Sequence, residues 1–248
     1  MNKLKFSQAN TKLKKLYKVK EVASHLKGRK VYSLDTLSGH SCIGAKECKS
    51  AAVIKNGKRQ IYDFPGLKFR CFSASQEVTY SGVYNLRSHN IDLIKSLSRS
   101  PKKLTDQIEK DLPKDCGVLR WHVAGDWMNF NQLKAALNVA RNHKDIWFYH
   151  YTKSLPLLIK ARDQGLIPDN WRWTASRGGK FDYLIDKENL REAVVVYSEQ
   201  EAQDLGLEID NDDSHCLLPG PSFGLLIHGV QRANSFAAKA LQKIKVKK

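Results

Sequence analysis

Three cysteines lie in the first third of the sequence, and their chemistry is its strongest functional signal. Five residues separate Cys42 from Cys48, and 22 separate Cys48 from Cys71. Thiolates are soft ligands that suit zinc or an iron–sulfur cluster, and a cluster needs three or four of them in one place. The surrounding segment is rich in glycine, which argues against simple burial, although free cysteines also pack well in a core. We expect an iron–sulfur cluster of the [4Fe–4S] type, with zinc or buried structural thiols as the alternatives.

The two other cysteines are separated from this group by their positions in the chain. Cys116 precedes a predicted strand and should lie at the opposite end of the sheet, where its role is structural. Cys216 also precedes a strand, but the connection over residues 205–222 can reach back, at up to about 3.3 Å per residue. We therefore expect Cys216 as a fourth metal ligand. Four thiolates close a metal site, whereas three leave a coordination position open.

Polar side chains recur where the predicted strands run into the following loops. In parallel α/β architectures these carboxyl ends meet at one edge of the sheet and carry the reactive groups. Helix caps explain part of the pattern, since Ser154 and Ser198 are suited to begin helices. Gly178–Gly179 would let backbone N–H groups approach an anion, or would form an ordinary turn. The side chains that we expect to hold a cofactor or substrate by charge-assisted hydrogen bonds are Asp126, Lys153, Arg177 and His228.

A harder metal site is a further alternative. Asp212, Asp213 and His215 could hold a hard cation, although a capped turn is the simpler explanation of such a run. A metal-dependent phosphodiesterase would use Asp213 and His215 with His122 and Asp126. No tight pair of carboxylates recurs at the strand ends, so this chemistry is the weaker interpretation.

The elements that must position these residues alternate regularly between strand and helix. Alternation of this kind predicts parallel strands joined by right-handed crossovers. Six such units fit a doubly wound sheet or a partial barrel, and we expect an α/β fold with a partial (β/α)6 barrel-like parallel sheet. The predicted strands cover residues 30–34, 118–124, 146–151, 171–175, 193–197 and 223–228.

Composition and charge define the class of protein. The chain has 248 residues, 42% of them hydrophobic and 27% charged, and a formal net charge of +17, which favours anionic partners. Residues 1–30 contain ten Lys or Arg and one Glu. We predict a basic helical arm over residues 1–29, which binds nucleic acid without sequence preference or serves as a solubilising tail, and one barrel-like domain over residues 30–248.

No apolar run is long enough to span a bilayer and no secretory signal is visible, so no membrane partner is expected.

Several short motifs together resemble the bacteriophage "gene product 88" family. The resemblance runs from about residue 31 to the C-terminus and implies a bacteriophage protein, which we expect in the cytoplasm of the infected bacterial host. Separately from this resemblance, the basic charge makes nucleic acid or a host protein the expected partner. The motifs are Gly39-His40-Ser41-Cys42-Ile43-Gly44-Ala45, Phe69-Arg70-Cys71-Phe72, His122-Val123-Ala124-Gly125-Asp126, Tyr149-His150-Tyr151-Thr152-Lys153-Ser154, Thr174-Ala175-Ser176 and Ser222-Phe223 to His228-Gly229.

The layout is also similar to that of the radical SAM superfamily. Those enzymes use a six-unit partial barrel in which three cysteines after the first strand hold a [4Fe–4S] cluster, and its open iron binds S-adenosylmethionine. Gly125-Asp126 after the second strand is similar to the region that contacts the methionine end of that cofactor. This chain departs from the superfamily in the wide separation of Cys71 from the other two cysteines. Three functions therefore stay open: a redox or ligand-binding cluster protein, a radical enzyme, or a zinc-stabilised nucleic-acid-binding protein.

Overall fold

The main sheet of the protein is open and mostly parallel. The computed structural model describes residues 3–246, and its eight-stranded sheet has the order β1-β2-β5-β6-β7-β8-β10-β9. Every neighbouring pair is parallel except β1 with β2. The strands are β1 (Ser7–Gln8), β2 (Lys30–Leu34), β5 (Cys116–Trp121), β6 (Trp147–Thr152), β7 (Trp171–Ser176), β8 (Glu192–Val196), β9 (Glu208–Ile209) and β10 (Phe223–Leu226).

The strand order decides between the two predicted architectures. The six predicted strands are β2, β5, β6, β7, β8 and β10, and each lies beside its predecessor among these six. A doubly wound sheet reverses its order at a switch point, and this sheet does not. The α/β class and the sequential strand order of a partial barrel are therefore confirmed. The sheet stays open, because its two edges are the short strands β1 and β9.

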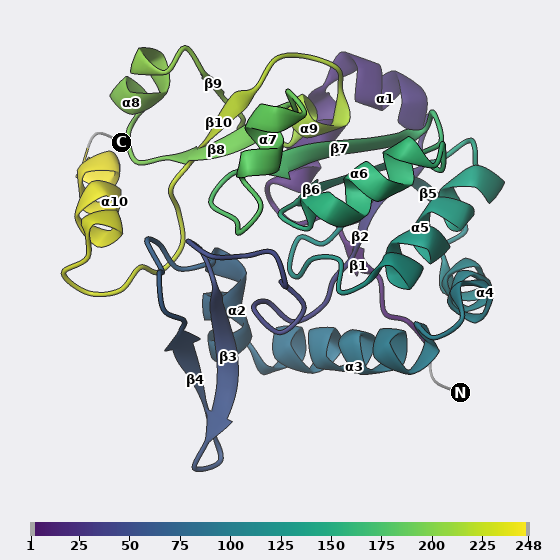
Figure 1. Ribbon diagram of the computed structural model, residues 1–248, viewed down its shortest axis with the longest axis horizontal. Helices are drawn as coiled ribbons and strands as arrows, with labels where there is room; N and C mark the ends of the chain where they lie inside the picture. Colours follow the sequence, from purple (N-terminus) through teal and green to yellow (C-terminus); the bar gives the residue numbers. More distant parts are fainter. Residues whose placement is uncertain (1–2, 247–248) are drawn as a thin grey trace.

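Helices cover the outer face of the sheet, where aromatic side chains of the strands pack against them. Trp121, Phe148 and Trp171 share one core cluster with Leu133 of α5 and Leu158 of α6. Figure 1 shows these helices beside the sheet. The helices after β5 are α5 (Phe130–Asn142), α6 (Leu155–Asp163), α7 (Tyr183–Lys187), α8 (Glu199–Asp204), α9 (Ser214–Leu217) and α10 (Phe236–Val246), and those between β4 and β5 are α2 (Phe72–Thr79), α3 (Ser81–Leu97) and α4 (Pro101–Asp111).

The basic N-terminal segment packs against the inner face of the sheet and differs from the predicted arm. It forms a 3-10 helix, η1 (Leu13–Lys18), and α1 (Lys20–Leu26). The leucine and valine side chains of both helices are buried, in a cluster that also contains strand residues of β5, β6 and β10. These side chains, Leu13, Leu16, Val22 and Leu26, fill part of the core of the main domain.

The cysteine region contains a second, two-stranded sheet. Strand β3 (Ser50–Lys55) pairs with β4 (Lys58–Asp63) in an antiparallel hairpin that projects from the body of the protein (Figure 1). Asn56 and Gly57 form its turn, with φ of 51° and 70°, the left-handed geometry that a tight hairpin requires. The sequence prediction placed only loop here. Within the described residues, no helix is long and apolar enough to cross a membrane.

Candidate metal centre and ligand cavity

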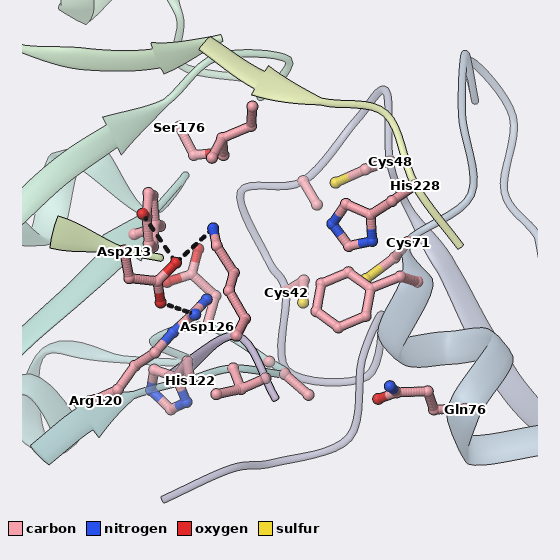
Figure 2. A pocket seen from close by; sticks show the side chains of 18 of the residues that line it. Cys42, Cys48, Cys71, Gln76, Arg120, His122, Asp126, Ser176, Asp213 and His228 are labelled. Carbon is pink, nitrogen blue, oxygen red and sulfur yellow. Dashed lines mark hydrogen bonds and ion pairs between the residues drawn. The ribbon is translucent and has the colours of Figure 1, made fainter. Parts of the chain in front are cut away.

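A cavity of about 410 Å³ opens at the carboxyl ends of the strands. Figure 2 shows thiols on one side of it and charged side chains on the other. We call the first side the cysteine wall (Cys42, Cys48 and Cys71) and the second the acid–base wall (Lys12, Arg120, Tyr151 and Asp213), all of which line the cavity. Alternate residues of β5 and β6 point into this space, because successive side chains of a strand face opposite sides of the sheet.

The hairpin explains how Cys71 reaches the other two cysteines. The chain leaves the cavity after Cys48, runs out and back through β3 and β4, and returns beside its starting point. The backbone N–H of Cys71 donates to Ser50 Oγ at 3.1 Å. The N–H groups of Lys68 and Phe69 both donate to the carbonyl of Glu47, at 2.8 and 3.1 Å. The long separation between Cys48 and Cys71 in the sequence is therefore closed at the base of the hairpin.

Glycine residues hold the cysteine wall against the ends of β6 and β7. A Cβ at Gly44 would lie 2.2 Å from the Lys153 carbonyl oxygen, so only glycine permits this approach. The Gly44 carbonyl accepts from Lys180 N–H at 2.8 Å. The Gly178 carbonyl accepts from Glu47 N–H at 2.9 Å, while Gly178 N–H donates to the Asp182 carboxylate at 2.8 Å. The glycine pair after β7 therefore anchors the cysteine loop.

The three thiols are free and half-buried. Burial raises the pKa of Cys42 well above its ordinary value, and the nearby Asp126 and the other two cysteines raise it further. Burial likewise raises the pKa of Cys48 to about 11, although the ammonium of Lys153 opposes this shift. Without a metal, the thiols of Cys42 and Cys48 stay protonated at neutral pH. A bound cation would favour the thiolates, because metal binding releases thiol protons.

The spacing of the cysteine sulfurs bears on the kind of metal. Across the described residues, only Asp210, Asp212 and His215 form a set of three potential ligand atoms within 4.8 Å of one another. The sulfurs of Cys42, Cys48 and Cys71 therefore do not all lie within 4.8 Å of one another. Four thiolates around one zinc ion lie about 3.8 Å apart, given Zn–S bonds of about 2.3 Å. A cluster distributes its ligands over several iron atoms and so suits a wider set.

Cys216 lies outside the cavity. It belongs to α9, where it is buried in the core cluster that contains Leu13 and Phe223. Its Sγ donates to the His150 carbonyl at 3.4 Å. The connection over residues 205–222 does fold back toward the site, but it brings Asp213 to the cavity. Cys116 is buried at the start of β5, as predicted, with its Sγ 3.6 Å from the Val118 carbonyl.

Asp213 is the centre of the acid–base wall. Its buried carboxylate accepts from Lys12 Nζ at 2.6 Å, from Tyr149 OH at 3.1 Å and from Tyr151 OH at 3.3 Å. It also forms an ion pair with Nη1 of Arg120. Burial opposes ionisation of Asp213, but Arg120 and Lys12 outweigh it and lower its pKa below the ordinary value. The residue takes a left-handed backbone conformation, with φ of 69°.

Two of the four predicted cofactor-binding residues form one polar group beside the cysteine wall. Asp126 accepts from Thr152 Oγ1 at 2.7 Å and from the N–H of Lys153 at 2.9 Å, and burial raises its pKa. The Lys153 ammonium donates to the Ser176 carbonyl at 3.1 Å and to the Arg177 carbonyl at 2.9 Å. Both side chains line the cavity.

Of the other two predicted residues, one lines the cavity and the other does not. His228 lines the cavity, with its ring 4.6 Å from that of Phe72. The Arg177 side chain instead pairs with Asp186 and Glu192 and does not line the cavity. The sequence prediction missed Lys12, Arg120 and Tyr151. The sequence did contain a signal for Arg120 and His122. They occupy alternate positions of the predicted strand over residues 118–124, whose other residues are apolar.

A family model described as "Gene product 88" matches residues 4–245. This match begins earlier than the predicted resemblance and includes the basic N-terminal segment. No curated protein and no solved structure matches the chain.

Proposed function

The chain belongs to the gene product 88 family of bacteriophage proteins, and we propose that it is an iron–sulfur protein with a [4Fe–4S] cluster held by Cys42, Cys48 and Cys71. The observation that carries this proposal is the convergence of three free thiols at one cavity, two from the loop before β3 and one from the segment after β4. Their sulfurs do not all lie within 4.8 Å of one another, whereas thiolates around a single zinc ion lie about 3.8 Å apart.

The placement of Cys216 favours an open cluster over a closed one. Its thiol is buried elsewhere, against the His150 carbonyl. Three thiolates leave one iron without a protein thiolate, and that iron would face the cavity. An open iron of this kind can bind and reductively cleave S-adenosylmethionine, which generates an organic radical. This chemistry agrees with the sequential strand order of the partial barrel, which the radical SAM enzymes also have.

The residues of the cavity would bind and orient such a cofactor. Lys153 places a positive charge near Cys48, where it favours the thiolate. Asp126 fixes the ends of β5 and β6 by hydrogen bonds to Thr152 and Lys153. His228 stands at the cavity wall beside Phe72 and would limit access of water. Free thiols persist in reducing compartments, so we place the protein in the cytoplasm of the infected host.

Metal analysis and spectroscopy test this proposal. Protein purified without oxygen should contain iron and sulfide and absorb broadly near about 400 nm, from charge transfer between thiolate or sulfide and iron. S-adenosylmethionine should shift the electron paramagnetic resonance signal of the reduced protein. Stoichiometric zinc, or a colourless preparation without iron, would overturn the cluster. An iron signal indifferent to S-adenosylmethionine would leave a redox or ligand-binding cluster and exclude the radical enzyme.

A further inference from the structure

Arg120 presents an unused hydrogen-bonding edge in the cavity wall. The residue is 9% exposed, and its Nη1 pairs with Asp213. Its Nε has no hydrogen-bond partner among the described residues, although this atom is buried. The Nε and Nη2 groups of arginine form one planar fork that matches two oxygens of a carboxylate or phosphate. A buried donor without a partner is costly, so a ligand that accepts from it would bind favourably.

His122 lies two residues further along the chain and has the same property. It is 4% exposed, it lines the cavity, and neither ring nitrogen forms a hydrogen bond of normal geometry with the described residues, although the backbone of Ala124 lies close enough to affect its pKa. Burial lowers its pKa to about 3, so the ring is neutral at pH 7 and offers one donor and one acceptor. Its φ is 61°, a left-handed conformation that is uncommon for a residue with a side chain. Backbone strain of this kind gathers at functional sites.

The charges of the cavity lining favour an anionic ligand. The cations are Lys12, Arg120 and Lys153, and the carboxylates are Asp126 and Asp213, which leaves one net positive charge. Lys12 is partly exposed and bridges Asp210 and Asp213. It could donate to a ligand held by Arg120 without leaving these partners, because an ammonium has three donors.

We propose that Arg120 and His122 form a substrate subsite for an oxyanion, a carboxylate or phosphate group of a small molecule. The unpaired edge of Arg120 binds two oxygens of this group, and His122 fixes its orientation with a neutral hydrogen bond. The substrate then lies between the acid–base wall and the cysteine wall. This inference rests on the proposed function and deepens it, because it names the chemical class of molecule that the cavity would hold beside the cluster.

Ligand titrations test the subsite directly. The ring of Trp127 lies 4.5 Å from that of His122, so tryptophan fluorescence should report binding. Acetate, inorganic phosphate and the neutral analogue acetamide are the probes, and acetate or phosphate should bind saturably and at least tenfold more tightly than acetamide. The preference between acetate and phosphate identifies the source of the oxyanion. Equal binding of acetamide, or no saturable binding of either anion, would overturn the inference.

Variants separate the subsite from general charge. Arg120→Lys keeps the charge but loses the fork, and it should weaken anion binding at least tenfold. The matched control is Arg177→Lys, which lies outside the cavity and should bind like the wild type. His122→Phe provides a second test that does not disturb the ion pair with Asp213, and it should also weaken binding. Wild-type affinity in both Arg120→Lys and His122→Phe would overturn the subsite.

Two further measurements keep the subsite distinct from the cluster. Wild-type binding of acetate should be constant between about pH 6 and 8, because arginine stays charged and His122 stays neutral there. A surface histidine site would instead weaken as the pH rises through about 6.5, and that result would contradict the subsite. Anion binding by protein that holds no cluster would support the subsite while the cluster proposal fails. A loaded cluster without anion binding would support the cluster and overturn the subsite.

Discussion

The cysteine wall and the acid–base wall face the same cavity, but their polar groups have different partners. On the acid–base wall, Asp213 accepts from two tyrosines and pairs with Lys12 and Arg120, so its charge is compensated inside the protein. On the cysteine wall, the thiols of Cys42 and Cys48 have raised pKa values and would need a cation to ionise. One wall has its charges paired within the fold, whereas the other becomes a charged site only with a metal.

The two walls also come from different parts of the architecture. Arg120 and Tyr151 of the acid–base wall occupy inward-facing positions of β5 and β6, which are fixed by the registers of the main sheet, and they meet Lys12 and Asp213 from two connecting segments. The cysteine wall is a loop held down by Gly44 and by the base of the β3–β4 hairpin. The charged network is therefore anchored to the main sheet through Arg120 and Tyr151, while the metal ligands lie on a segment that bound metal would stabilise further.

The largest expected effect is loss of the cluster when a ligand is removed from the cysteine wall. Cys42→Ser, Cys48→Ser and Cys71→Ser should each lose nearly all iron. Among the described residues, no further cysteine lines the cavity that could replace the missing thiolate. Cys116→Ala and Cys216→Ala are matched controls, since both thiols are buried outside it. Iron content per folded chain measures the effect. Loss of iron in folded Cys216→Ala would show that the fourth ligand is Cys216 after all.

A substitution in the acid–base wall should act on stability instead. Asp213→Asn leaves Arg120 buried without its counter-ion, and we expect the free energy of unfolding to fall by about 3–5 kcal/mol. Urea unfolding of protein with and without cluster measures this change. Wild-type stability in Asp213→Asn would contradict this difference between the two walls. An equal loss of stability in metal-free Cys42→Ser would contradict it as well.

The same ion pair predicts that the free energy of unfolding falls at acid pH. The pKa of Asp213 is lowered in the folded protein, so its contribution is complete above the ordinary value of about 3.9. The contribution is lost as the pH falls through the lower, folded pKa, where the carboxylate takes up a proton. Urea midpoints between about pH 7 and pH 2 should therefore fall less steeply on the acid side in Asp213→Asn than in the wild type.

A smaller effect is expected from the backbone that supports the cysteine wall. Gly44→Ala would bring a Cβ within 2.2 Å of the Lys153 carbonyl oxygen and should displace the loop, so that iron occupancy falls several-fold. The acid–base wall should be unaffected, and anion binding should persist. Gly82→Ala is the control, because a Cβ there meets nothing within 4 Å. Full occupancy in Gly44→Ala would show that the loop does not need its present position to hold a metal.

The smallest effect concerns the outward side of η1. Lys12 points into the cavity, whereas Lys14, Lys15 and Lys18 are basic residues of this segment that could contact nucleic acid. Replacing these three with Gln should weaken duplex DNA binding a few-fold and reduce its salt dependence by up to about 3 in the logarithmic slope. Truncation of residues 1–29 is not a clean test, since it also removes core residues. Unchanged binding across a salt series would assign these lysines to solubility alone.

The sequence by itself determined the six parallel strands, their convergent carboxyl ends and the three cysteines of one wall. These features follow from local periodicity and from residue type, which act over a few neighbouring positions. The Asn56-Gly57 turn of the hairpin also carried a local signal, which the sequence interpretation did not use. The resemblance to the gene product 88 family was confirmed by the family match.

Only the tertiary structure decided which polar residues meet. Arg177 follows a strand as Lys153 does, yet it turns outward because Glu192 and Asp186 lie beside it. Asp213 enters the cavity and Cys216, three residues later, enters the core, a difference that depends on how α9 packs against β6. The basic N-terminal segment is part of the core because its buried leucine and valine side chains pack against strand residues that are far away in the sequence. Contacts between residues far apart in the chain depend on packing and charge pairing in three dimensions, and local sequence patterns do not contain that information.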